Sequence, residues 1–146
     1  RVRLPGSGGA NDIISLCNEV LIVTQHEPRR FVERVDFITS PGYLSGGDSR
    51  ARAGLLTGRL GAVVTDLALL DFEPVTRRMR LRALQPGVSV SQVRAQTGFD
   101  LLVSDELTEL TPPAPEEIVI YRELRDGPAA GVACVAQPDR VAAGPA

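Results

Sequence analysis

The residues best suited to chemistry in this chain occupy positions 6–12, which read Gly-Ser-Gly-Gly-Ala-Asn-Asp. Small residues let backbone N–H groups approach a ligand without obstruction by side chains. Asn11 or Asp12 can cap a short helix that follows and extends to about residue 17, and the N-terminal end of a helix attracts negative charge. The pattern indicates an anion-binding loop, with a tight structural turn between a strand and a helix as the alternative.

Other polar side chains are candidates as well, and each has a structural alternative. His26, the single histidine, follows an apolar run and is suited to act as a general base, although a structural or surface role is favoured. Ser7 has no recognisable triad partners, so we reject a serine nucleophile. Thr39 and Ser40 precede a Pro-Gly turn, where their hydroxyls either line a pocket or, as is favoured, satisfy the turn.

Two groups of charged side chains complete the set. The arginines of a Gly- and Ser-rich segment either contact the phosphates of a ligand or, as is favoured, remain solvated; they are Arg50, Arg52 and Arg59. Carboxylates flank a predicted hairpin, where strand-end and turn roles are favoured over shared acid–base work; they are Asp66, Asp71 and Glu73. Cys17 and Cys134 are isolated, so we expect neither a disulfide nor a metal site.

Composition narrows the class of protein. The chain has 146 residues, 43% of them hydrophobic and 23% charged, as expected for a globular domain. A net charge of −2 gives no indication of nucleic acid or an anionic membrane as partner. No signal peptide and no apolar run of roughly 18 residues is visible, so we expect a cytoplasmic protein. The chain starts with Arg and its single methionine is Met79, so we expect a longer parent chain.

The first half of the chain is expected to alternate strands and helices. Residues 1–4 are a candidate strand, and residues 19–24 form an apolar run typical of a strand buried on both faces of a parallel sheet. With the glycine loop and helix between them, they form a unit like βαβ. Residues 31–38 are interpreted as a strand or extended segment, and residues 39–60 as a long mobile surface loop.

The second half adds a hairpin and two helices. Strands are predicted over residues 61–67, 69–72, 79–84 and 99–103, and the section formed by the first three is expected to be antiparallel at the sheet edge. Ser89 and Gln92 form a capping box for a short helix, after which Gly98 is placed in the left-handed position. Pro115 is expected in the first turn of a helix that extends to about residue 125. The fold class is therefore α/β, a mainly parallel sheet flanked by helices with an antiparallel edge hairpin. Residues 127–146 are expected to be disordered.

Five segments in one order carry a resemblance to a known family. They read GSGGAND, VLIVTQH, FVERVDFITSPG, VVTDLALLDFEP and PGVSVSQVRAQTGFDL. Together they resemble the C-terminal half of the β subunit of family I CoA-transferases, of the glutaconate and 3-oxoacid types. The resemblance covers roughly residues 2–125, so residues 1–126 are expected to be the C-terminal part of one CoA-transferase-like domain. Related subunits act as ring-opening CoA hydrolases in bacterial steroid degradation.

The resemblance implies a site and partners. The loop's backbone donates hydrogen bonds to an oxyanion, which maps to Gly8 and Gly9, while Ser7, Ala10 and Asn11 are expected to contact substrate. The family's nucleophilic glutamate precedes this loop and is not expected within these residues. A homologous α subunit is implied, in a heterodimer or heterotetramer, with coenzyme A as substrate and product and with no permanently bound cofactor. Three hypotheses remain: a CoA-transferase subunit, a ring-opening CoA-ester hydrolase, or a non-catalytic binding fragment.

Overall fold

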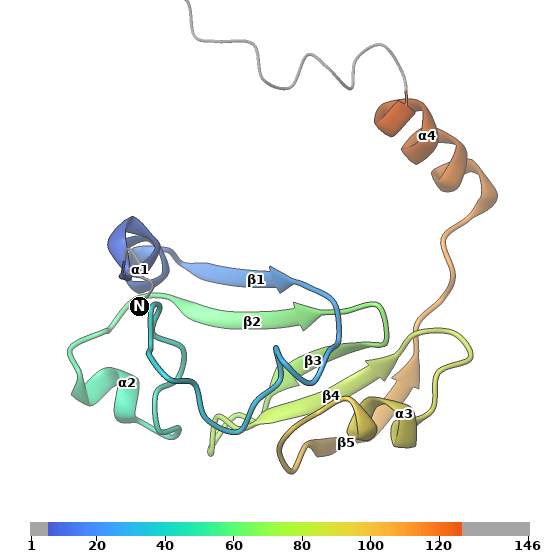
Figure 1. Cartoon of the computed structure of the whole chain (residues 1–146). Helices are drawn as coiled ribbons and strands as arrows, with labels where there is room; N and C mark the ends of the chain where they lie inside the picture. The colour runs from blue at the N-terminus through green and yellow to red at the C-terminus, as the bar shows by residue number, and fades with distance from the viewer. Residues whose placement is uncertain (1–5, 127–146) are drawn as a thin grey trace, which may run out of the picture. The chain divides into compact units, whose positions relative to one another are not determined.

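The computed structural model describes residues 6–126 of the chain (Figure 1). These residues belong to two units, one that extends to Thr111 and one that begins at Pro112, and each is described by itself. The strand expected over residues 1–4, the disordered tail expected over residues 127–146 and Cys134 lie outside the described residues.

The first unit is built on a five-stranded sheet in the order β1-β2-β3-β4-β5. The pairs β1–β2 and β4–β5 are parallel, and the pairs β2–β3 and β3–β4 are antiparallel. All strands except β3 therefore run in one direction, and the predicted α/β fold with a mainly parallel sheet is confirmed. The bounds are β1 Glu19–Val23, β2 Arg59–Val64, β3 Ala68–Phe72, β4 Met79–Leu84 and β5 Leu102–Glu109.

The antiparallel hairpin lies in the middle of this sheet, so its predicted place at the edge is wrong (Figure 1). Short connections explain the arrangement. Residues 65–67 join β2 to β3 and residues 73–78 join β3 to β4, and such short turns permit only antiparallel neighbours. The longer crossovers over residues 24–58 and 85–101 allow the parallel pairs on either side of it.

The core lies on one face of the sheet. Val63 on β2 pairs with Leu70 on β3, and Leu70 pairs with Leu81 on β4, so these three side chains share a face. Phe31 from the β1–β2 crossover and Val93 from the β4–β5 crossover are buried in the same cluster. Both long crossovers therefore return to the same face of the sheet and cover it.

β1 departs from its prediction. Its apolar run is typical of a strand buried on both faces, but Leu21 is 65% exposed and Val23 is 81% exposed. Among the described residues, β1 is an edge strand that pairs only with β2. Apolar composition predicts the strand correctly, but the burial of a strand depends on neighbours that its own sequence does not specify.

Helix α1 spans Gly8–Leu16, and Ser7 is its N-cap, so the prediction of Asn11 or Asp12 as the cap is wrong. Gly8 adopts a φ of 49°, which lets the chain enter the helix at least four residues earlier than the polar side chains indicate. Asn11 instead lies within the helix, where its Oδ1 accepts a hydrogen bond of 3.3 Å from the Ser15 hydroxyl.

The other helices agree better with expectation. α3 spans Val90–Ala95 and begins with the predicted capping box of Ser89 and Gln92. α4 spans Pro115–Asp126 in the second unit and begins at the expected proline. The short helix α2, Ser49–Arg52, is not predicted by the sequence pattern, and it interrupts the segment interpreted as a mobile loop.

Two segments differ from their predicted strands. Residues 31–38, interpreted as a strand or an extended segment, form no strand and contain only an isolated parallel bridge, between Val32 and Gly98. The strand predicted over residues 99–103 begins later and is longer, as β5. Polar residues such as Asp105 and Glu106 conceal this strand because, among the described residues, β5 is the opposite edge of the sheet and these side chains meet water.

Gly98 is required for close approach rather than for a left-handed turn, so the prediction of a positive φ is wrong. Its N–H donates to the Phe31 carbonyl over 2.7 Å. A Cβ at this position would lie 2.7 Å from that same oxygen. The absence of a side chain therefore lets the β1–β2 crossover reach the end of α3.

Gly98→Ala is expected to destabilise the fold by about 1–3 kcal/mol, because the added methyl group meets backbone that cannot move independently. Urea unfolding measures the free energy change. Gly9→Ala is the matched control, since a Cβ there meets nothing within 4 Å and the position is helical. Equal stability of the two variants would contradict this account of Gly98.

Candidate active site

The glycine loop and the start of α1 present unpaired backbone donors. The first N–H groups of a helix have no carbonyl partner within the helix, and here they include those of Gly8, Gly9 and Ala10. The Ser7 side chain makes no capping hydrogen bond to them, and the first turn of α1 contains no acidic residue. The positive end of the helix dipole therefore remains available to an external anion or oxyanion.

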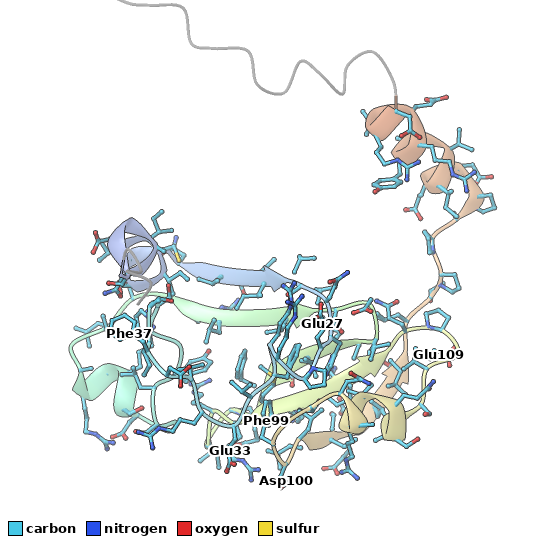
Figure 2. The ribbon with its side chains drawn as sticks, in the orientation of Figure 1. Glu27, Glu33, Phe37, Phe99, Asp100 and Glu109 are labelled. Carbon is cyan, nitrogen blue, oxygen red and sulfur yellow. The ribbon has the colours of Figure 1, made fainter. Side chains whose placement is uncertain are left out.

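The space around the loop is open. A Cβ built on Gly8 or Gly9 would meet nothing within 4 Å. Gly6 lines a hollow of about 730 Å³ whose other walls come from the β1–β2 crossover and include Arg34, Val35 and Phe37. Figure 2 labels Phe37 on this crossover, on the side of the molecule where α1 lies. The loop therefore borders a cavity large enough for part of a ligand.

A second hollow, of about 440 Å³, lies beside the first. The two share Val35, Phe37 and Thr39 as walls. The second is mainly apolar, and Ser40 is among its lining residues, as are Ile22, Leu60, Phe72 and Met79. Thr39 and Ser40 thus lie at a pocket, which is the less favoured of their two interpretations. The two hollows are therefore adjacent, one beside the glycine loop and the other on the covered face of the sheet.

The three candidate arginines are occupied elsewhere, so a role in phosphate binding has no support in their geometry. Arg52 is exposed and forms an ion pair with Asp48, and Arg59 pairs with Glu19 at 3.0 Å. Arg50 is buried, with 7% of its surface exposed, so its favoured interpretation as a solvated loop residue is wrong. Its guanidinium donates to backbone carbonyls instead.

His26 is a buried structural residue. Its ring stacks on Phe31 with centroids 4.0 Å apart, its Nδ1 lies 3.2 Å from the Thr65 hydroxyl, and its Nε2 lies 3.0 Å from the Thr97 hydroxyl. The Thr97 hydroxyl donates to the Val93 carbonyl, and the Thr65 hydroxyl donates to the Ala68 carbonyl, so each hydroxyl oxygen is placed to accept a hydrogen bond from an imidazole N–H. With both nitrogens engaged, His26 has no geometry for general-base catalysis.

Burial lowers the pKa of the His26 imidazole, while the nearby charge of Asp66 raises it by less. The backbone N–H of His26 donates to Asp66 Oδ1 over 2.7 Å. These contacts fasten the start of the β1–β2 crossover to the β2–β3 turn and to the end of α3.

The predicted acidic cluster divides into separate structural roles, as is favoured from the sequence. Asp71 forms a bidentate pair with Arg80 across β3 and β4, at 2.9 and 2.8 Å. Glu73 accepts hydrogen bonds from the Thr76 hydroxyl and from backbone N–H groups in the β3–β4 turn, which lower its pKa to about 2. The side chain of Asp66 is taken up by His26, so no pair of carboxylates is left for acid–base work here.

Among residues 6–126, no group of three or more His, Cys, Asp or Glu side chains is arranged to hold a metal ion. In the same range, no helix has the length and apolarity to span a membrane.

Sequence reasoning misses two features of this region. The first is the buried position of Arg50, for which the only signal is an arginine in a Gly-rich segment with few acidic neighbours. The second is that residues 35–42 form a wall of the hollows. Their apolar side chains follow no strand or helix period, because they line a cavity and do not pack in a layer.

Comparison with known proteins defines the class. The family model described as "Coenzyme A transferase" matches residues 1–96, and the chain belongs to the coenzyme A transferase family. A crystal structure of glutaconate coenzyme A-transferase from Acidaminococcus fermentans superimposes with a TM-score of 0.73 at 37% identity, over 94% of this chain and 52% of that chain.

The named relatives include B subunits of such enzymes. It is 44% identical over 128 residues to the B subunit of glutaconate CoA-transferase from A. fermentans, which covers 86% of this chain and 47% of the relative. It is 36% identical over 124 residues to the B subunit of 3-oxoadipate CoA-transferase from Pseudomonas knackmussii, covering 85% and 48%. The IpdB subunit of a cholesterol ring-cleaving hydrolase from Rhodococcus jostii is 28% identical over 104 residues, covering 71% and 40%. The chain thus spans about half the length of these relatives.

Because burial lowers the pKa of His26, the stability of the fold is expected to depend on pH in a specific way. Its folded pKa lies below the unfolded value of about 6.5, so the unfolded chain binds a proton first as the pH falls. The stabilisation is present above about pH 6.5 and is lost as the pH falls through the folded pKa, by at most about 1.4 kcal/mol per pH unit for one proton. Urea unfolding between pH 8 and pH 5 is the measurement, with His26→Gln as control. Superimposable pH profiles for the two proteins would contradict this assignment.

Proposed function

We propose that this chain is part of the β subunit of a CoA-transferase that moves coenzyme A between carboxylic acids through acyl-CoA thioesters. One observation carries the proposal: α1 begins with N–H groups that have no partner within the helix, Gly6 of the same loop lines the first hollow, and the apolar hollow shares three lining residues with it. Such a site suits a thioester whose carbonyl oxygen lies at the helix end and whose acyl group lies against the sheet.

The proposed chemistry depends on charge that develops during the reaction. Attack on a thioester carbonyl places negative charge on its oxygen, and backbone donors about 3 Å away lower the barrier by roughly 3–4 kcal/mol. Gly8 and Gly9 are proposed as these donors, aided by the helix dipole. The Ser7 hydroxyl, the Ala10 N–H and the side-chain nitrogen of Asn11 are proposed to contact the substrate around that oxygen.

The two hollows are proposed to divide the substrate between them. The apolar hollow would accommodate the acyl group, since its walls are mainly hydrophobic and it lies on the covered face of the sheet. Arg77, at its margin, stacks over the Tyr43 ring at 5.1 Å and offers a cation to a polar acyl group. The hollow beside Gly6 would receive the thioester end, near the guanidinium of Arg34.

Group transfer also needs a nucleophile, and the family resemblance implies a glutamate. Its carboxylate would attack the thioester, release the CoA thiolate and form a mixed anhydride. The thiolate would then attack the glutamyl carbonyl, release the first acid and leave a glutamyl-CoA thioester. We assign this glutamate to a part of the β subunit outside these residues, and the relatives of about twice this length support that assignment.

Partners and setting follow from the same proposal. Both transferase relatives are named as B subunits, which supports association with a homologous α subunit in a heterodimer or heterotetramer. Coenzyme A would enter and leave as substrate and product, with no permanently bound cofactor. A cytoplasmic location fits a substrate of this kind.

A ring-opening CoA-ester hydrolase is the second candidate, favoured by the similarity to the IpdB subunit. In that reaction water, rather than a protein carboxylate, would be the attacking group. The same oxyanion donors would serve both reactions, so the glycine loop does not distinguish them. The two reactions are distinguished by whether a covalent intermediate forms on the enzyme.

Trapping that intermediate is the decisive test between the two candidates. The assembled complex is incubated with an acyl-CoA and then with borohydride, which reduces a glutamyl-CoA thioester to a primary alcohol and inactivates the enzyme irreversibly. Mass spectrometry locates the modified glutamate. Inactivation that depends on acyl-CoA is expected, and borohydride alone is the control. Sustained turnover without any trapped adduct would exclude the transferase mechanism.

The glycine loop is tested by Gly9→Val. The side chain has room in the fold, but it obstructs approach of a thioester to the donors, so kcat is expected to fall by about 10²–10³-fold. Gly9→Ala should give a smaller loss, and Ile13→Val, an exposed change in the same helix, should have no effect. Circular dichroism verifies that each variant folds. Unchanged turnover in Gly9→Val would contradict the oxyanion role.

A further inference from the structure

Arg50 combines burial with an unusual set of partners. Its guanidinium makes five hydrogen bonds, all to backbone carbonyl oxygens. Nη1 donates to Pro41 at 3.2 Å and to Gly42 at 3.0 Å. Nη2 donates to Ile14 at 3.3 Å, to Ser15 at 3.4 Å and to Thr57 at 2.9 Å. No described carboxylate lies within ion-pair distance of this guanidinium.

These carbonyls belong to three segments far apart in the sequence. Ile14 and Ser15 lie in the last turn of α1, whose carbonyls have no partner within the helix. Pro41 and Gly42 line the apolar hollow. Thr57 precedes β2. One side chain therefore joins the helix that carries the glycine loop to the wall of the neighbouring hollow.

The chemistry of this position selects arginine. The carbonyl dipoles at the C-terminal end of α1 compensate the positive charge in place of a carboxylate. Only a planar guanidinium directs donors to opposite sides at once, whereas a lysine ammonium is a point charge with three donors. Gly58 makes room for it, because a Cβ there would lie 2.9 Å from Arg50 Nη2 and 2.6 Å from the Cys17 carbonyl.

Helix α1 depends on this contact because hydrophobic packing does not fix it. None of its residues is buried, and Ile13 and Leu16 are largely exposed. The other polar links between this region and the segment before β2 are a 3.4 Å hydrogen bond from the Thr57 hydroxyl to the Ser15 carbonyl and a 3.1 Å bond from Arg59 N to the Asn18 carbonyl.

We propose that Arg50 is a positioning residue: it holds the glycine-loop helix and the Pro41–Gly42 wall in fixed relation, so that the oxyanion donors face a substrate seated in the hollow. The structural part stands on the hydrogen bonds alone. The catalytic part rests on the function proposed above. A displacement of about 1 Å between donors and substrate costs on the order of 10²-fold in rate.

Arg50→Lys in the assembled complex tests the structural part by amide hydrogen exchange. Exchange in the hydrogen-bonded amides of α1 is expected to become at least about tenfold faster, because the helix loses its tether. Exchange in β3 and β4 should remain unchanged, which verifies that the core is folded. Arg52→Lys, in the same helix α2 but exposed and outside both hollows, is the matched control and should leave α1 unchanged. Unchanged α1 exchange in Arg50→Lys overturns the inference whatever the turnover.

A measurement on the unaltered protein covers the case in which Arg50→Lys does not fold. The amides of Cys17, at the end of α1, and Leu55, which donates to the Arg50 carbonyl, should open with the same free energy in native-state exchange at low denaturant. Independent opening of the two amides would overturn the proposal.

Kinetics test the catalytic part. Arg50→Lys is expected to lower kcat by about 10²-fold, with a smaller change in KM for the acyl-CoA. Faster exchange in α1 with unchanged kcat would overturn the catalytic part and leave the structural part standing. The Gly9 variants would then decide whether the loop is catalytic. A lowered kcat with unchanged α1 exchange would overturn the tether and leave the proposed function standing.

Discussion

Burial of a single face of the sheet is the interaction on which the rest of this structure depends. Val63, Leu70 and Leu81 form a continuous apolar layer across three strands, and both long crossovers return to cover it. Each fully buried aliphatic side chain contributes roughly 1.5–3 kcal/mol. Because the β1–β2 crossover contributes Phe31 to this layer, the residues that follow Phe31 are brought past the glycine loop, where they enclose the two hollows.

Buried polar contacts also hold the β1–β2 crossover in place. His26 fastens the start of the crossover to the β2–β3 turn and to α3. Arg50 fastens a later part of it to α1. Both side chains are buried, and their polar contacts are mainly with oxygen atoms of neighbouring loops rather than with an ion-pair partner, although Arg50 Nε has no hydrogen-bond partner among the described residues. Long irregular segments need such internal partners, because their backbone groups have no ladder to join.

Features set by local chemistry can be predicted from the sequence. The capping box of Ser89 and Gln92 involves only four adjacent residues. The alternation of apolar and basic residues over 79–84 follows from the two faces of a single strand. The central place of β3 is missed, although short turns on both sides of it imply antiparallel neighbours. The burial of Arg50 and the role of Gly98 depend on segments distant in the chain, so no local pattern reveals them. The glycine loop is found from sequence, but the space it borders is not, because its walls come from residues that pack irregularly.

β1 carries a consequence for the behaviour of the chain in solution. Its outer edge has no strand beside it among the described residues, and Leu21 and Val23 point largely into solvent. An apolar strand with an unpaired row of N–H and C=O groups is a template for edge-to-edge pairing with other strands. Neither proline nor lysine occurs in this strand to prevent such pairing. Without a neighbour to cover it, β1 is therefore the segment from which self-association and precipitation would begin. A polar substitution at Val23 would increase solubility.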